Sequence, residues 1–213
     1  MTRILAVADE VDQALYGERL DELKPDLVLS AGDLPFDYLE YLVSRLNVPL
    51  LYVPGNHDPD VHAPDRTWTA LSPEIPDPGP PGCINVDDRV VEAAGLRIAG
   101  LGGSMRYRPG PNQYSAAHMR RRALRLRLLM RFKRARPGPR LDVLLTHAPP
   151  VGADGADADL AHRGFPAFND LIRDLTPQVH VHGHVHPYGV ARRVHKVGRT
   201  LVLNAVPYRV IAI

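Results

Sequence analysis

The sequence predicts an α/β protein, a four-layer α/β/β/α sandwich in which two mixed sheets pack face to face and helices cover their outer sides. Three observations predict it. Short aliphatic runs alternate with segments of helical spacing in the first quarter of the chain, and further β-like runs follow later. Several of the runs end in turns that carry Asp, Asn or His. The 213 residues, 45% of them hydrophobic, suffice for one substantial core, so we expect residues 1–213 to form a single domain.

The N-terminal part predicts strands that alternate with helices. Apolar runs at 4–8, 27–30 and 50–53 indicate three strands. The two segments between them place leucines at helical spacing, and each stops before a proline, Pro25 or Pro49. A strand that is followed by a helix and a second strand normally pairs in parallel with that strand. We therefore expect adjacent parallel strands here.

The rest of the chain supplies a long loop and the second sheet. Residues 59–82 hold seven of the 21 prolines, which favours a surface loop over a domain linker because strands resume beyond it. Runs at 89–93 and 96–101 predict a hairpin across Ala94-Gly95. Further strands are expected at 141–145 and 179–181, and three more β-like runs lie within 189–212.

A basic segment, residues 120–140, begins at Arg120 and ends at Arg140 and lies in a stretch without acidic residues. An apolar stripe at helical spacing predicts a helix that packs on a sheet and points its arginines outward. The stripe consists of Met119, Ala123, Leu126 and Met130, widened by Leu124, Leu128 and Phe132. A nucleic-acid surface is one interpretation. The favoured one is a covering helix whose arginine stems lie over apolar neighbours.

Composition excludes several classes of protein. The formal net charge is only +2, so the whole chain is not a polycation. A single cysteine, Cys83, rules out a disulfide scaffold and a cysteine-based zinc site. The N-terminus lacks the long apolar stretch of an export signal, and no run approaches the roughly 20 apolar residues of a membrane span. We therefore expect a soluble, cytoplasmic protein with no membrane partner.

Strand-terminal turns carry the residues that point to chemistry. They are Asp9, Gly32-Asp33, Gly55-Asn56-His57-Asp58, His147 and Gly183-His184-Val185-His186. Because the carboxyl ends of parallel strands lie at one edge of a sheet, we expect these turns to meet in one cleft. Their order and spacing resemble the calcineurin-like metallophosphoesterase superfamily, and the resemblance covers nearly the whole chain. It implies the sandwich fold described above and a metal-dependent phosphoesterase.

The resemblance also implies two divalent cations and their ligands. One site would use Asp9, Asp33 and His186, and the other Asp33, Asn56, His147 and His184. Asp33 is the implied bridge, because a carboxylate can offer one oxygen to each ion. Oxygen ligands mixed with imidazole suit Mn, Fe or Zn better than Ca.

The first motif departs from the family pattern. The usual form is Asp-x-His, whereas this chain has Asp9-Glu10-Val11, and the aliphatic Val11 cannot coordinate a cation. Glu10 and Asp12 are neighbouring carboxylates, but we do not favour them as substitutes because their directions along the chain differ from that of the missing imidazole. We expect one tight metal site and a possible second site that is weakened.

The resemblance assigns catalysis to His57, which would protonate or polarise the leaving group without binding metal, and to Asp58, which would orient its ring. A helix N-cap remains the alternative role for Asp58. Asn56 is also a substrate-binding candidate. His162 and Arg163 lie in a turn that resembles one found in a branch of this superfamily. That branch includes cyclic-nucleotide-type phosphodiesterases. These two residues would contact substrate phosphate or be merely solvated.

These residues together predict a hydrolase that cleaves phosphate esters with a metal-activated water, with phosphodiesters favoured over monoesters. The preference rests on the branch resemblance and on Arg106, Arg108 and Arg163 as possible donors to a larger charged substrate. Its substrate would be a phosphate-containing small molecule or nucleotide. The alternative is a catalytically weakened metal-binding sensor or scaffold for phosphate-containing ligands, which Val11 suggests and the retained His57 argues against. His180 and His182 lie within an apolar strand and are expected to pack or hydrogen-bond there instead of binding metal.

Overall fold

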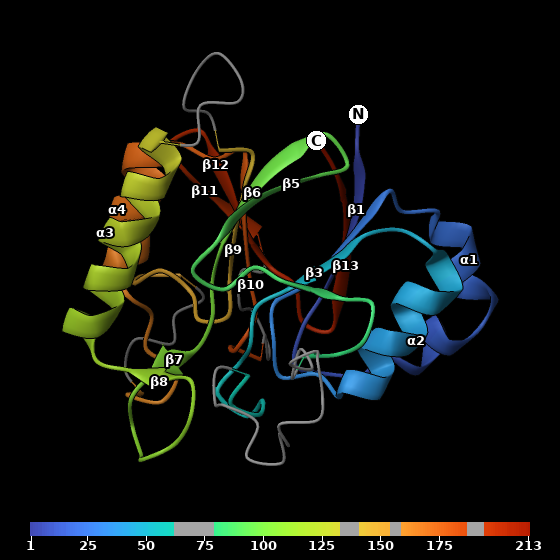
Figure 1. Cartoon of the computed structure of the whole chain (residues 1–213), viewed down its shortest axis with the longest axis horizontal. Helices are drawn as coiled ribbons and strands as arrows, with labels where there is room; N and C mark the ends of the chain where they lie inside the picture. Colours follow the sequence, from blue (N-terminus) through green and yellow to red (C-terminus); the bar gives the residue numbers. More distant parts are fainter. Residues whose placement is uncertain (62–78, 133–140, 154–158, 187–193) are drawn as a thin grey trace, which may run out of the picture.

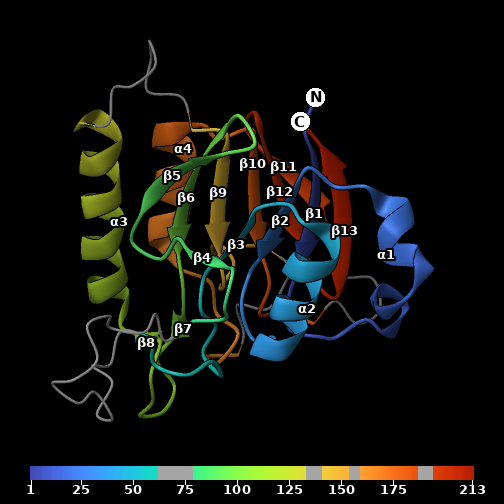
Figure 2. The same ribbon diagram turned by 45° about the vertical axis from the view of Figure 1, so that its right-hand side comes forward.

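The computed structural model describes residues 1–61, 79–132, 141–153, 159–186 and 194–213. Within these ranges, two large mixed sheets lie between pairs of helices, α1 and α2 on one side and α3 and α4 on the other (Figure 1). The turned view of Figure 2 keeps the same order of layers. The predicted four-layer α/β/β/α sandwich is thus confirmed.

The first sheet has the strand order β13-β1-β2-β3-β4. Its bounds and those of its helices are β1 Arg3–Val7, α1 Glu18–Leu23, β2 Leu27–Ser30, α2 Phe36–Leu46, β3 Leu50–Tyr52, β4 Ile84–Asn85 and β13 Tyr208–Ala212. The pairs from β1 to β4 are parallel, as predicted for the first three strands, and β13 is antiparallel to β1. Leu15, Leu20, Leu39 and Leu42 bury the inner faces of the helical segments against this sheet.

The second sheet has the order β11-β12-β10-β9-β6-β5. Its strands are β5 Val90–Ala93, β6 Leu96–Leu101, β9 Val143–Thr146, β10 Val179–His182, β11 Val194–Val197 and β12 Thr200–Asn204. The predicted hairpin of β5 and β6 is present and antiparallel. A small parallel ladder, β7 Ser104–Met105 with β8 Gln113–Tyr114, and the helix α4 Pro166–Leu175 were not predicted.

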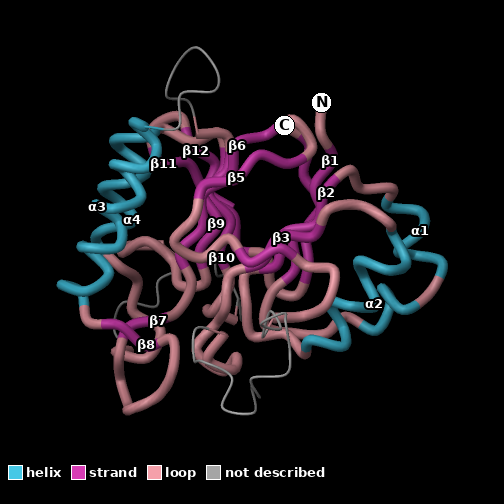
Figure 3. The backbone as a smooth tube through the Cα atoms, viewed as in Figure 1, coloured by secondary structure: helices cyan, strands magenta, loops and turns pink. Residues whose placement is uncertain are grey.

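The main core fills the space between the two sheets. Ile4, Leu29 and Leu51 of the first sheet belong to the same buried cluster as Ile98 and Leu145 of the second. Because helices cover the outer faces as well, the central strands are buried on both sides, which explains their continuous apolar sequence. In Figure 3 the loops that follow the parallel strands gather below the sheets, on the side away from both termini.

Helix α3, Ala116–Phe132, confirms part of the amphipathic prediction. The stripe of Met119, Ala123, Leu126 and Met130 is buried. The expectation that Leu124 and Leu128 widen it is wrong, because both side chains are largely exposed, and so is the expectation that all the arginines face outward, because Arg122 is buried. Within the described ranges, every helix is too short or too polar to cross a membrane.

Some predictions fall on residues outside the described ranges. They concern most of the proline-rich loop (62–78), the end of the basic segment (133–140, with the side chain of Phe132), residues 154–158 and residues 187–193.

A candidate metal centre where the two sheets meet

Four of the predicted ligands come together at the carboxyl ends of the central strands. Asp9 follows β1 and Asp33 follows β2 in the first sheet, while His147 follows β9 and His184 follows β10 in the second. One potential ligand atom from each lies within 4.8 Å of the others. Two carboxylates and two imidazoles form a donor set suited to a divalent transition metal. The residues present therefore fit the group that the sequence motifs imply.

The backbone is strained at three of these four positions. Asp9, Asp33 and His184 have φ angles of 60°, 56° and 69°, in the left-handed region that residues other than glycine rarely adopt. Strain of this kind costs about 1–3 kcal/mol per residue and clusters at functional sites. The packing of the sandwich maintains these backbone conformations despite their energetic cost.

Glycines allow the motif loops to approach one another. A Cβ atom at Gly55 would collide with the carboxylate of Asp33, and one at Gly183 would collide with the carboxylate of Asp9. The glycines of the two motifs are therefore required by close approach, and an alanine at either position would push a predicted ligand away from the cluster.

His147 is fully buried and links the two carboxylate-bearing loops. Its Nδ1 lies 2.7 Å from the carbonyl oxygen of Ala31, so this nitrogen carries a proton. Its Nε2 lies 3.3 Å from Asp33 Oδ2 and 3.0 Å from Asn56 Oδ1. Nε2 is therefore the nitrogen that faces the other predicted ligands, which is the orientation a metal-binding histidine needs.

The charges in the cluster depend on one another. Burial lowers the pKa of His147, but the charge and hydrogen bond of Asp33 together outweigh it and raise the pKa to about 9. Burial raises the pKa of Asp33, and the opposing effect of His147 and the hydrogen bond from His57 N–H brings it down to about 2. A cation would take the place of the proton that His147 Nε2 shares with these oxygens.

Asp9 and His184 lie on the other side of the cluster. Burial raises the pKa of Asp9 to about 6, and its Oδ2 accepts the backbone N–H of His184 at 2.8 Å. Burial lowers the pKa of His184 to about 3, so its ring is neutral. Its Nε2 lies 2.7 Å from the carbonyl oxygen of Ala161 and donates to it, which leaves Nδ1 as the potential ligand atom.

Two further predicted ligands remain: Asn56 lies against His147, and His186 stands outside the group of four. The Nδ1 of His186 lies 2.7 Å from Glu10 Oε1. Val11 packs against the apolar cluster beneath α1 and α2. Asp12 accepts the N–H of Ala14 at 2.9 Å and caps the short 3-10 helix Gln13–Tyr16. Of the two carboxylates beside Val11, Glu10 is thus the one that contacts a predicted ligand.

The motif that contains Asn56 also places His57 and Asp58. The side chain of His57 is exposed, and its backbone N–H donates to Asp33 Oδ1 at 2.7 Å. Asp58 Oδ2 accepts the N–H of Gly55 at 2.7 Å and that of Asp33 at 3.0 Å. These contacts tie the two motif loops together, and burial raises the pKa of Asp58. The two roles considered for Asp58 stay predictions.

The turn with His162 and Arg163 lies beside the cluster. The ring of His162 is 5.4 Å from that of His184, and its Nδ1 is 2.6 Å from Asp159 Oδ2. Arg163 is exposed. The contact between the two rings places His162 beside the cluster.

His180 and His182 lie within β10 and are fully buried, in keeping with the structural role expected for them. Thr146 Oγ1 donates to the carbonyl oxygen of Ala148 at 2.7 Å, so His180 Nε2, also at 2.7 Å, is the donor to that hydroxyl. Burial keeps the pKa of His180 well below its usual value. This neutral ring hydrogen-bonds Thr146, the last residue of β9, directly before His147.

Sequence reasoning missed Tyr107, whose hydroxyl lies 3.4 Å from Asn56 Nδ2. It also missed Asn112, whose Nδ2 donates to the carbonyl oxygen of Asp58 at 3.2 Å. Neither residue belongs to a metal-ligand pattern. The sequence indicated this loop only through Arg106 and Arg108, as possible donors to a charged substrate, and the signal for Tyr107 is its place between these two arginines.

Comparison with known proteins gives a family and a fold. A family model described as calcineurin-like phosphoesterase matches residues 3–188. One solved crystal structure superposes with a TM-score of 0.63 at 18% identity and covers 96% of this chain and 90% of its own. The Thermus thermophilus protein TT1561 gives a TM-score of 0.62 at 19% identity, over 96% of this chain and 88% of its own. At these identities the two structures show the fold alone. No curated protein matches this chain significantly.

Proposed function

Since the chain belongs to the calcineurin-like phosphoesterase family, whose members are in general metal-dependent phosphoesterases, we propose that it hydrolyses phosphodiesters in preference to monoesters. The observation that carries the proposal is the cluster of Asp9, Asp33, His147 and His184. The preference for diesters rests on the similarity of the His162 turn to that of a phosphodiesterase branch. Its substrate would be a phosphate-containing small molecule or nucleotide, in the cytoplasm.

The four residues of the cluster, together with Asn56 and His186, would hold the cations. Mn, Fe and Zn suit this donor set best. When bound, divalent cations supply Lewis-acid activation of water and neutralise phosphate charge. One oxygen of Asp33 faces His147, and the other accepts the N–H of His57.

His57 would give a proton to the oxygen of the leaving group. Its exposed imidazole stands on the loop that also carries Asn56, next to the cluster, while its backbone is fixed by Asp33. Asp58 holds that loop in place through the backbone of Gly55 and Asp33. His162 and Arg163 would contact the substrate phosphate from the opposite loop.

Replacing His57 by alanine tests this assignment. We expect kcat/KM for bis-p-nitrophenyl phosphate to fall about a hundredfold or more, the usual contribution of a general acid, while the metal content stays unchanged. The measurement is steady-state kinetics with Mn, Fe and Zn, combined with elemental analysis. His195→Ala on β11 is the control and should keep full activity. Metal binding without any turnover in the wild type would instead favour the sensor or scaffold.

Val11 predicts unequal occupancy of the two cation positions. We expect one metal equivalent per chain after gentle dialysis, and a second only in excess metal, as measured by native mass spectrometry. Val11→His, which restores the family pattern, should retain the second equivalent, whereas the matched Val11→Ala should not. Two tightly held equivalents in the wild type would contradict the prediction.

The basic segment is not proposed as a nucleic-acid site. On α3, Arg122 is paired with Asp87 and Asp88, and Arg127 with Asp174. These pairs support the favoured interpretation of a helix that covers the sheet, with part of its charge neutralised within the protein.

A further inference from the structure

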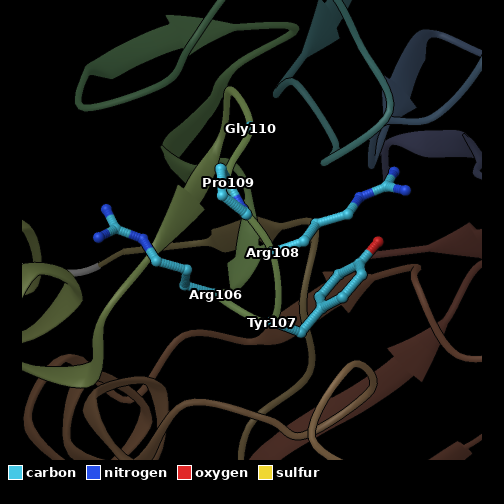
Figure 4. Close-up of a pocket in the computed structure, with 5 residues that line it drawn as sticks. All are labelled: Arg106, Tyr107, Arg108, Pro109 and Gly110. Atoms are coloured by element: carbon cyan, nitrogen blue, oxygen red, sulfur yellow. The ribbon is translucent and has the colours of Figure 1, made fainter.

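The loop between β7 and β8 forms a pocket, and one of its lining residues, Tyr107, contacts Asn56 of the candidate metal centre. Residues Arg106, Tyr107, Arg108, Pro109 and Gly110 line a space of about 460 Å³ (Figure 4). None of them belongs to a family motif that the sequence analysis used. The pocket is therefore a feature of this chain whose purpose the catalytic residues leave unexplained.

Buried side chains hold this loop in one conformation. The side-chain oxygen of Gln113 accepts the N–H groups of Tyr107 and Arg108, each at 3.3 Å. Asn112 Nδ2 donates to the carbonyl oxygens of Asp58 and Pro59, so the loop is also attached to the motif that carries His57. A loop fixed at both ends binds a ligand without a large cost in conformational entropy.

Tyr107 brings a hydrogen-bond donor to the edge of the cluster. Its hydroxyl oxygen accepts from Asn56 Nδ2 at 3.4 Å, which leaves the phenolic proton able to donate elsewhere. Asn56 in turn lies 3.0 Å from His147 Nε2 through its Oδ1. The phenol thus contacts one predicted metal ligand, Asn56, and is one side chain away from another, His147.

Arg108 adds a positive charge on the same side. Figure 4 shows its side chain and the hydroxyl of Tyr107 extending in the same direction, while Arg106 extends in the opposite one. Arg108 is exposed, and among the described residues no carboxylate pairs with its guanidinium, which lies 5.3 Å from the ring centre of Tyr107. The guanidinium Nε and Nη2 of Arg106, by contrast, donate to the carbonyl oxygen of Gln113 at 3.3 Å.

We propose that Tyr107 and Arg108 form a subsite for a second phosphate group of the substrate, next to the one that is cleaved. A guanidinium with all its donors available matches phosphate geometry, and a phenol adds a further donor. The substrate class is therefore a phosphate ester or anhydride with a further phosphate beside the reacting one. This inference rests on the proposed function, since the metal cluster must hold the first phosphate.

Binding of non-hydrolysable ligands to the manganese-loaded protein tests the subsite. Methylenediphosphonate offers two phosphonate groups and methylphosphonate one, and isothermal titration gives Kd for both. We expect Arg108→Gln to weaken diphosphonate binding about tenfold or more, and Tyr107→Phe to weaken it about threefold, with the affinity for methylphosphonate unchanged in both. Arg108→Lys should lie between Arg108→Gln and the wild type, because lysine keeps the charge but loses the planar fork.

Arg120→Gln is the matched control, since it removes the same charge from an exposed position on α3 outside the pocket lining, and it should leave both affinities unchanged. The subsite is refuted if Arg108→Gln weakens the two ligands equally, or neither. A circular dichroism spectrum checks that each variant is folded. Turnover is measured separately: selective diphosphonate binding without hydrolysis of any phosphate ester would refute the proposed function and leave the subsite standing.

Discussion

Asp33→Asn is expected to lower kcat/KM toward phosphate esters by about a hundred- to a thousandfold. Asparagine keeps the shape of the side chain and an oxygen for the N–H of His57, but it removes the negative charge that faces His147. Loss of a ligand charge removes several kcal/mol of electrostatic stabilisation, and each 1.36 kcal/mol is a factor of about ten in rate. Steady-state kinetics and the metal content of the purified variant measure the effect, and both should fall together.

Asp37→Asn provides the control, because Asp37 is an exposed carboxylate in the first turn of α2, four residues further along the chain. It should leave both activity and metal content unchanged. An Asp33→Asn protein with wild-type rates would show that the activity arises elsewhere in the chain or from a contaminant, and the proposed centre would have to be abandoned.

Arg122→Met is expected to destabilise the fold by about 3–5 kcal/mol, the usual cost of breaking a buried ion pair. Arg122 Nη2 lies 2.5 Å from Asp87 Oδ1, and the side chain of Asp87 is completely buried. The guanidinium also donates to Asp88 at 3.0 Å and to the carbonyl oxygen of Gly102, and it lies 4.3 Å from the ring centre of Tyr114. Methionine fills a similar volume but leaves the buried carboxylate of Asp87 without Arg122 as its counterion, with the N–H of Gly102 still donating to it. Equilibrium urea unfolding gives the difference in free energy.

Two further variants separate the ion pair from packing. Arg121→Met changes the neighbouring, exposed arginine and should alter the free energy of unfolding by less than about 0.5 kcal/mol. In the double variant Arg122→Met with Asp87→Leu the buried charge is gone, so much of the lost stability should return. An Arg122→Met protein as stable as the wild type would mean that Asp87 takes up a proton or another partner at little cost.

The elements that the sequence predicts well are those in which burial determines composition. The strand at 27–30 is observed with the predicted bounds, the strand at 50–53 differs by one residue at one end, and the strand at 4–8 differs by one residue at each end. These bounds are predictable because central parallel strands are apolar on both faces. Four of the predicted metal ligands meet because strand order brings their loops to one edge. Their roles, and those of His57 and Asp58, remain predictions.

What the sequence does not predict depends on pairing between distant residues. Arg122 stands three residues after Met119 and four before Leu126, so helical spacing places it on the buried face. Its ion pairs with Asp87 and Asp88 offset the desolvation cost of burying the guanidinium, and the spacing does not reveal these partners. The short strands β7 and β8 have too few residues for a periodic signal. Tyr107 gains its position from the contacts of that loop.

The two sheets contribute equally to the cluster, with Asp9 and Asp33 from one and His147 and His184 from the other. An ion bound there would cross-link the two sheets of the sandwich. The free energy of metal binding would then add to the free energy of folding, so the metal-loaded chain is expected to resist heat and protease better than the metal-free one. Cellular metal supply would thereby set how long each molecule survives as well as how fast it works.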